Sequence, residues 1–227
     1  YDSSLLIEAE FPEKMNYIKI YPCYNPIISN DLFFAENEKE IVDILSNGGV
    51  IAFVTDTVWG LGCLPDNEKA VKKIYEIKHR EAKKPLILMS NESYNLLKYV
   101  KQPISKIGQK LMKEHFPGAL TVVLEKSEET PNYLTSDMPT IGIRVPDNQV
   151  FKEICEIIDG HVLATTSANL SGDPAALSYE EAIKYVGDKA DMVIPDYGHK
   201  AAGRASTVAG FKDGAVVIFR QGDVEIL

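Results

Sequence analysis

The sequence contains little cysteine, few arginines and no long apolar run. No stretch approaches the ~20 apolar residues that a membrane-spanning helix needs, so we expect no membrane partner. The three cysteines, Cys23, Cys63 and Cys155, are odd in number and far apart, which argues against a disulfide framework and is typical of a cytoplasmic protein. Because neither Cys-x-x-Cys nor His-x-x-x-His occurs, the sequence does not predict a structural zinc site.

Several common catalytic and nucleotide-binding motifs are also missing. Gly60-Leu-Gly62 is no dinucleotide fingerprint, because Pro65 stands where the third glycine belongs. The chain has no Gly-x-x-x-x-Gly-Lys-Ser/Thr loop, and Ser167 is not part of a Gly-x-Ser-x-Gly elbow. Cys63 has no histidine placed to activate it. These absences argue against the common nucleotide folds and against serine or cysteine hydrolases.

The net charge limits the ligands that the chain can hold. Its 227 residues carry a formal net charge of −9 at pH 7, with 45% hydrophobic and 25% charged residues, as in an ordinary globular protein. A protein that grips nucleic acid over a broad face usually has a basic surplus. We therefore expect any anionic ligand to lie in a local pocket, and direct binding of nucleic acid to be weak at most.

Arginine is scarce, which draws attention to each arginine present. Only four of the 24 basic residues are arginines: Arg80, Arg144, Arg204 and Arg220. The planar guanidinium binds phosphate or carboxylate through two parallel hydrogen bonds, which lysine cannot do. The alternative is that all four form incidental surface pairs.

Short apolar runs alternate with helical patterns and predict one α/β domain, residues 35–227, with a twisted, open, mixed or parallel sheet flanked by helices. Residues 1–34 are interpreted as an N-terminal tail or extension. In the predicted helix 67–79, Asp66 can cap the first turn. Strands are expected at 50–54, 86–89, 120–124, 141–145, 162–165, 192–194, 206–209 and 215–219, and the other helices at 36–47, 91–99, 103–114, 148–159 and 178–187.

The loops that follow strands should form the site, because ligands of open α/β sheets lie beyond the carboxyl ends of strands. These loops are Thr55–Gly62, Thr166–Gly172 and Gln221-Gly222. In the strand 141–145, Arg144 shares a face with a glycine, which leaves room beside the cation. The alternative is an edge strand with a solvated arginine.

Three polar clusters are candidates for this site. Lys78-His-Arg80 ends a helix and suggests a phosphate clamp, although a solvated basic helix end is the alternative. The segment Ser167–Gly172 follows a strand and offers neutral hydrogen-bonding groups, unless it is an ordinary turn before a helix. Arg204-Ala-Ser-Thr207 places an arginine beside two hydroxyls, which suits phosphates or a ribose.

Together, these segments resemble the YrdC-like family over about residues 35–222. The family's Pro-Thr-Glu-Thr-Val-Tyr-Gly-Leu-Gly segment is similar to residues 54–62 here, with Val54, Asp56 and Trp59 as departures. Further departures are Met89, Ala205 and Gly210, which bear on substrate selectivity. The other matching segments are Lys78-His-Arg80 with Lys84-Pro85-Leu86, FPGALTVVL (116–124), IGIRVPD (141–147), TTSANLSG (165–172), GRASTV (203–208) and FRQG (219–222).

The resemblance implies a short, single-domain threonylcarbamoyl-AMP synthase. Such an enzyme makes threonylcarbamoyl-adenylate and pyrophosphate from L-threonine, bicarbonate or CO₂, and ATP with Mg²⁺. Its product serves the threonylcarbamoyladenosine modification of tRNA, so the implied partner is a downstream tRNA-modifying threonylcarbamoyl transferase. No metal-ligating side chains are predicted.

The resemblance also implies the roles of individual residues. Lys78, Arg80, Ser167 and Asn169 are the implied catalytic residues. The threonine site is expected to comprise Thr55, Trp59, Met89, Arg144, Thr165 and Ser206. The ATP site is expected to comprise Lys78, Arg80, Thr121, Ser167, Asn169, Arg204, Thr207 and Arg220.

Two other functions stay open at this point. An RNA-binding module of the same fold is one, although the negative charge and the lack of interleaved aromatic and arginine residues count against it. A carbamoyltransferase relative that uses carbamoyl phosphate is the other, although such domains usually belong to longer, multidomain chains.

Overall fold

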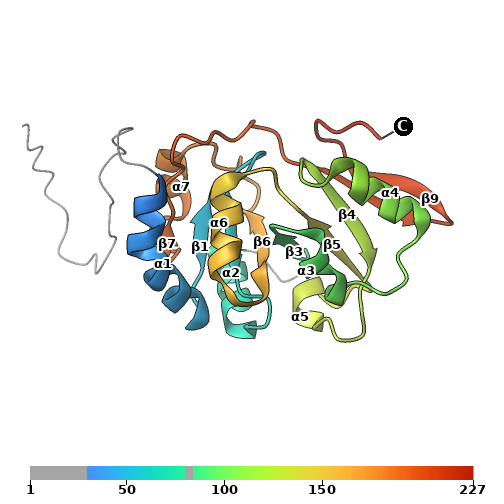
Figure 1. Cartoon of the computed structure of the whole chain (residues 1–227), viewed down its shortest axis with the longest axis horizontal. Helices are drawn as coiled ribbons and strands as arrows, with labels where there is room; N and C mark the ends of the chain where they lie inside the picture. The colour runs from blue at the N-terminus through green and yellow to red at the C-terminus, as the bar shows by residue number, and fades with distance from the viewer. Residues whose placement is uncertain (1–29, 80–83, 227) are drawn as a thin grey trace, which may run out of the picture.

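The structure is a computed structural model that describes residues 30–79 and 84–226, with side chains from residue 37 onward. Most of the predicted N-terminal tail, residues 1–29, lies outside the described residues. The described chain folds around one mixed sheet with helices on both faces (Figure 1). The predicted fold class is therefore confirmed.

The sheet has nine strands among the described residues, in the order β7-β1-β2-β6-β3-β5-β4-β8-β9. Three pairs are parallel (β1 with β7, β3 with β5, β4 with β8), and the other five are antiparallel. All eight predicted strands are found, and their observed ends lie within three residues of the predicted ends. Strand β7 is one residue shorter than predicted. The strands are β1 (Ile51–Phe53), β2 (Gly60–Cys63), β3 (Ile87–Ser90), β4 (Leu120–Glu125), β5 (Thr140–Arg144), β6 (Val162–Ser167), β7 (Met192–Val193), β8 (Thr207–Lys212) and β9 (Ala215–Arg220).

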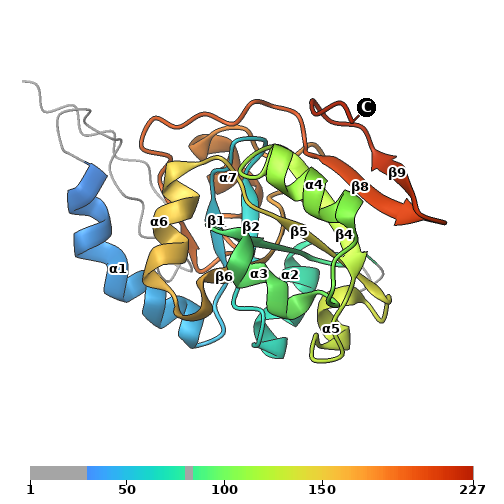
Figure 2. The same cartoon turned by 45° about the vertical axis from the view of Figure 1, so that its right-hand side comes forward.

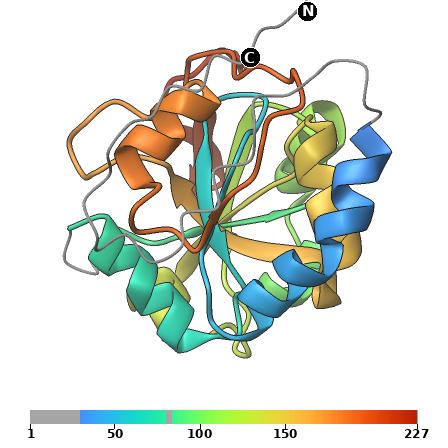
Figure 3. The same cartoon turned by 90° about the vertical axis from the view of Figure 1, so that its left-hand side faces the viewer.

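The helices cover both faces of the sheet, as the end-on view shows (Figure 3). Helices α1 and α6 lie on one side, and α2 and α7 lie on the other (Figures 1 and 3). Helix α4 lies on β4 (Figure 2). The helices are α1 (Asn30–Ser46), α2 (Glu68–Ile77), α3 (Ser93–Leu96), α4 (Lys106–His115), α5 (Asn132–Thr135), α6 (Gln149–Ile157) and α7 (Tyr179–Val186), with 3₁₀ turns at Leu97–Tyr99 and Asp159–His161.

Two helix starts differ from the sequence-based expectation. Helix α1 begins at Asn30, so its first turns fall within the predicted tail. Helix α2 is capped by Asn67 instead of Asp66, because the Asn67 side chain accepts a hydrogen bond from the Ala70 N–H at 3.0 Å. Asp66 and Asn67 are both residue types that commonly cap helices, so the sequence does not distinguish them. The backbone conformation decides which of the two is the N-cap.

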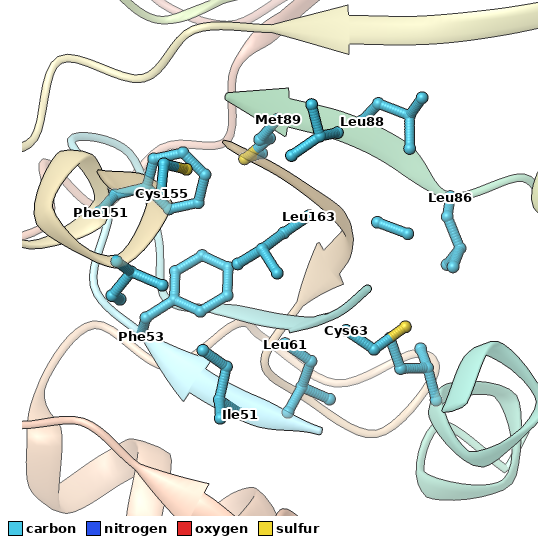
Figure 4. Packing of buried hydrophobic residues seen from close by; sticks show 14 of the residues in the cluster. Ile51, Phe53, Leu61, Cys63, Leu86, Leu88, Met89, Phe151, Cys155 and Leu163 are labelled. Carbon is cyan, nitrogen blue, oxygen red and sulfur yellow. The ribbon is translucent and has the colours of Figure 1, made fainter. Parts of the chain in front are cut away.

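The core explains why a glycine-rich segment forms β2. A Cβ atom on Gly60 or Gly62 would lie 2.9 or 2.8 Å from the Phe53 ring. That ring packs against Phe151 of α6, with the ring centroids 5.2 Å apart (Figure 4). The predicted loop Thr55–Gly62 is therefore wrong at its end: its last residues pair with β1 and β6.

Two cysteines lie among the described residues, and both are buried and free. Burial and the Asp66 carboxylate raise the pKa of the Cys63 thiol to about 12, and burial also raises that of Cys155. In the described part of the chain, every helix is too short or too polar to cross a bilayer.

Candidate functional site

A cavity of about 410 Å³ gathers side chains from segments that are far apart in the sequence. It lies where the loop after β1, the end of α2, the strands β3, β5 and β6, and the end of β9 meet. Most of the predicted site residues line it. They are Thr55, Trp59, Lys78, Met89, Arg144, Thr165, Ser167, Asn169, Ser206 and Arg220.

The cavity lies partly over a face of the sheet and not only beyond strand ends. Ile87 pairs with Thr165, and Met89 pairs with Arg144. Residues that pair across neighbouring strands, and residues two apart on one strand, share a face. These four side chains therefore enter the cavity from one face of β6, β3 and β5, which extends the expected loop site into the sheet.

Lys78 lines the cavity together with Ser167, the last residue of β6, and Asn169, which follows that strand. Its amine donates to the Ser167 carbonyl oxygen at 2.6 Å and to the Asn169 side-chain oxygen. The Ser167 hydroxyl also donates to that amide oxygen, at 2.7 Å. The Asn169 amide nitrogen donates to the Asp173 carbonyl oxygen at 2.5 Å, which fixes which end of the amide faces Lys78. The cation is thus held at a defined point.

The local backbone explains why Lys78 turns inward. Lys78 is the C-cap that follows the last residue of α2, and His79 has a φ of 47° in the left-handed region, which turns the chain away from the helix. The Lys78 carbonyl oxygen accepts from the Ser171 N–H at 3.1 Å, so the helix end is tied to the loop after β6. The side chain is only 2% exposed, so the alternative of a solvated helix end is wrong for Lys78. Arg80 lies outside the described residues.

Arg144 lines the cavity from the end of β5 and is as buried as Lys78, at 2% exposure. Its Nε donates to the Gly118 carbonyl oxygen at 2.9 Å, and its two terminal nitrogens donate to the Thr57 hydroxyl at 2.9 Å and to the Asp56 carboxylate at 2.5 Å. Burial lowers the pKa of Arg144, while Asp56 acts in the opposite direction. Because β5 lies between β3 and β4, the edge-strand alternative is wrong.

Thr55 lines the cavity, but its hydroxyl is already engaged within its own loop. It donates to the Val58 carbonyl oxygen at 2.6 Å and accepts from the Thr57 and Val58 N–H groups at 3.2 and 3.3 Å. A hydroxyl has a single proton to donate. In this arrangement Thr55 therefore has no proton left for a ligand, and its predicted contact with threonine stays a prediction.

Arg220 reaches the cavity from the end of β9. Its Nε donates to the Ser206 carbonyl oxygen at 3.0 Å, and a terminal nitrogen donates to the Ser206 hydroxyl at 3.1 Å. Burial lowers the pKa of Arg220. The Ser206 hydroxyl also bonds to Thr121 at 2.9 Å. Thr121 therefore stands behind Ser206 and does not line the cavity.

Two further predicted ATP-site residues do not line the cavity. Thr207 is fully buried, accepts from the Gly222 N–H at 2.9 Å and donates to the Val224 carbonyl oxygen at 2.8 Å, so it ties two loops together. Arg204 is exposed and pairs with Asp223 at 3.1 Å. Their predicted contacts with ATP stay predictions.

Trp59 forms a buried wall, as predicted, and its ring lies 6.0 Å from that of Tyr179. Its indole N–H is buried and has no hydrogen-bond acceptor among the described residues. A buried donor without a partner costs about 1–3 kcal/mol.

Sequence reasoning missed several residues that line the cavity or contact its lining. Asp56 was noted only as a departure from the family segment, yet it pairs with Arg144. Thr57, Lys84 and Ser171 also belong to the site. The usable signal was position: Asp56 and Thr57 are polar residues directly after a buried strand.

Known protein families and solved structures are similar to this chain. A family model named Sua5_yciO_yrdC, with the description "Telomere recombination", matches residues 43–222. The chain belongs to this family. The predicted family membership is therefore confirmed.

Relatives in the Sua5/YciO/YrdC family match most of the chain. A putative threonylcarbamoyl-AMP synthase of Methanocaldococcus jannaschii is 33% identical over 195 residues, which cover 84% of this chain and 90% of that protein. The threonylcarbamoyl-AMP synthase of Vibrio cholerae is 35% identical over 162 residues, or 70% of this chain and 85% of that protein.

Solved structures agree with the fold. P. abyssi Sua5 complexed with L-threonine has a TM-score of 0.75 and 32% identity, and the match covers 82% of this chain. This chain spans about half of that protein, with 54% covered. E. coli YciO has a TM-score of 0.73 and 27% identity, with 83% of this chain and 91% of YciO covered.

Proposed function

We propose that the protein is a threonylcarbamoyl-AMP synthase. The reaction joins L-threonine, bicarbonate or CO₂, and ATP to give threonylcarbamoyl-AMP and pyrophosphate. The names of the relatives from M. jannaschii and V. cholerae support this assignment. The cavity supports it independently, because a volume of about 410 Å³ lies within the usual range for small-molecule sites.

The observation that carries the proposal is the distribution of cations around one cavity. Among the described residues, four cations line it: Lys78, Lys84, Arg144 and Arg220. A carboxylated threonine and a triphosphate are both anionic, so they repel each other as they meet. Fixed cations offset that repulsion before an in-line attack on the α-phosphorus, and catalysis of this kind is mainly positioning and electrostatics.

The chemistry needs no covalent nucleophile. Once CO₂ has been captured by the threonine amine, an oxygen of the resulting carbamate attacks the α-phosphorus and pyrophosphate leaves. We propose that the Lys78 amine, held by Ser167 and Asn169, stabilises the charge that develops on the phosphate oxygens. Cys63 is not among the cavity residues, and its raised pKa keeps it a neutral thiol.

The threonine end is assigned to Arg144, with Met89 and Ile87 as the apolar wall beside it. A guanidinium binds a carboxylate through its fork, and the apolar side chains suit the methyl group of threonine. A methyl pocket alone gives about 1–3 kcal/mol of preference over serine.

Mg²⁺ is proposed to enter with ATP. None of the described residues that line the cavity is an aspartate or a glutamate. No group of three or more potential metal ligands occurs in the described part of the chain. ATP phosphates are common Mg²⁺ ligands, so the nucleotide is proposed to hold the ion.

The substrate-omission assay tests this function. Pyrophosphate release is followed with Mg²⁺ and ATP while threonine or bicarbonate is withheld in turn. We expect release only when both are present, because the attacking oxygen exists only after the amine has been carboxylated. Serine should replace threonine poorly.

Other outcomes would assign other functions. Pyrophosphate release in carefully CO₂-depleted buffer would indicate an amino-acid-activating enzyme that uses the threonine carboxylate. Cleavage of carbamoyl phosphate would indicate the carbamoyltransferase alternative, and salt-sensitive RNA binding without turnover would indicate the RNA-binding module.

The wider setting of the enzyme is proposed on the same basis. Its product would be used by a tRNA-modifying threonylcarbamoyl transferase, and a cytoplasmic location follows from the cysteine usage noted in the sequence. Product transfer to tRNA in a coupled reaction with such a transferase would test the first point.

A further inference from the structure

Thr57 lies beside the predicted contact residues and has no assigned role. Its side chain is 2% exposed, lines the cavity and accepts a hydrogen bond from a terminal nitrogen of Arg144 at 2.9 Å. A second hydrogen bond joins the Thr57 and Thr55 hydroxyls at 3.1 Å. The direction of this second bond determines what Thr57 does.

Proton counting fixes that direction. Each hydroxyl has one proton, and that of Thr55 is donated to the Val58 carbonyl oxygen at 2.6 Å. In the bond between the two hydroxyls, Thr57 is therefore the donor. The chain of donors then runs from Arg144 to Thr57, from Thr57 to Thr55, and from Thr55 to the Val58 carbonyl oxygen.

A second contact holds the same guanidinium from the same loop. Asp56 accepts from the other terminal nitrogen of Arg144 at 2.5 Å. The backbone of this loop is itself fixed, because the Asp56 and Thr57 carbonyl oxygens accept from the Ala202 and Gly203 N–H groups at 3.0 and 2.9 Å. The loop therefore forms a rigid bracket around Arg144.

The bracket leaves part of the guanidinium available. Arginine has five N–H donors, and three of those in Arg144 are used, one on each nitrogen. The two others, one on each terminal nitrogen, have no acceptor among the described residues, and Arg144 lines the cavity. A ligand carboxylate that uses them meets a cation whose orientation is already fixed, so binding does not bear the cost of ordering it.

We propose that Thr57 is a positioning residue that orients Arg144 and thereby sets the affinity for threonine. The proposal rests on the proposed function, in which Arg144 binds the threonine carboxylate. Thr57 does not touch the substrate in this scheme. Its hydroxyl holds one end of the guanidinium, and Asp56 holds the other.

The test compares Thr57→Val, which keeps the shape and removes the hydroxyl, with Thr57→Ser, which keeps the hydroxyl. Pyrophosphate release is measured with threonine varied at saturating ATP and bicarbonate, and then with ATP varied. We expect Thr57→Val to raise the KM for threonine tenfold or more while the KM for ATP changes less than twofold. Thr57→Ser should stay within threefold of the wild type for both.

Thr130→Val is the matched control. Thr130 is also 2% exposed and donates to the Tyr99 carbonyl oxygen, but it does not line the cavity. We expect both KM values of this variant to match those of the wild type. If circular dichroism shows that Thr57→Val does not fold, the same measurements are made on Thr57→Ala. The smaller alanine side chain lets water reach Arg144.

The outcomes separate the two proposals. A wild-type enzyme that needs threonine and bicarbonate, together with an unchanged threonine KM in Thr57→Val, would overturn the role of Thr57 alone. Equal rises in the KM values for threonine and ATP would overturn it as well. A wild-type enzyme with no threonine dependence would instead overturn the proposed function.

Discussion

Replacement of Arg144 by lysine tests the most sharply defined part of the site. Lysine keeps the positive charge and loses the planar fork. In the structure, three different nitrogens of Arg144 donate to the Gly118 carbonyl oxygen, the Thr57 hydroxyl and the Asp56 carboxylate. A lysine amine offers its donors from a single atom, so it cannot reach all three acceptors and a ligand carboxylate at once.

The magnitude follows from the hydrogen bonds that are lost. A hydrogen bond to a charged group contributes about 1.5–3 kcal/mol net. Suppose that the new lysine amine keeps a hydrogen bond to Asp56 and that water satisfies the Gly118 carbonyl oxygen. The variant then still lacks one charged hydrogen bond to the substrate. We therefore expect kcat/KM for threonine to fall tenfold or more, which corresponds to about 1.4 kcal/mol.

The assay is pyrophosphate release at varied threonine concentration, with circular dichroism and urea unfolding as controls for the fold. A folded Arg144→Lys variant with wild-type kcat/KM would refute the reasoning, because Arg144 would then act only as a diffuse charge. A loss confined to stability, with normal kinetics in the folded fraction, would assign Arg144 a structural role instead.

Three more outcomes follow from the contacts. Lys78→Met should lower kcat by about 10²-fold or more in the same assay, since it removes a fixed cation while it keeps an unbranched chain; a folded variant with normal kcat would contradict this. Gly62→Ala should lower the free energy of unfolding by about 1–3 kcal/mol in urea, because the added Cβ meets the Phe53 ring at 2.8 Å; unchanged stability would show that the ring moves freely. The pKa of the Cys63 thiol is raised to about 12, so the stability that the neutral thiol contributes is complete below about pH 9 and is lost as the pH rises toward 12. The unfolding midpoints of the wild type and of Cys63→Ala should therefore converge over that range. Midpoints that stay a constant distance apart would argue against this raised pKa.

Periodicity predicted the fold well where strands are built from β-branched and aliphatic residues. The strands β4, β5 and β9 were all expected within one residue of their observed ends. Strand β2 was missed because Gly60 and Gly62 have low strand propensity. Their presence reflects a tertiary requirement, the space taken by the Phe53 ring, which no local pattern reveals.

The candidate site was predictable where residue type alone pointed to chemistry. Scarcity singled out Arg144 and Arg220, and both line the cavity. Scarcity also singled out Arg204, but this residue is exposed and paired with Asp223. Composition carries no information about burial, so it could not separate Arg204 from the arginines of the cavity. Thr121 was expected in the ATP site, but it is separated from the cavity by Ser206, a relation that only the sheet register creates.

The position of Arg144 depends on the sheet as much as on the loops around it. Register places Arg144 opposite Met89, and Met89 opposite Leu163. A shift of β5 by one residue would turn Arg144 to the other face of the sheet, because side chains alternate with a period of two. The Thr57 and Asp56 bracket would then face no cation. The buried apolar residues that fix the register, Ile141 and Ile143, therefore hold the arginine in the cavity although neither lines it.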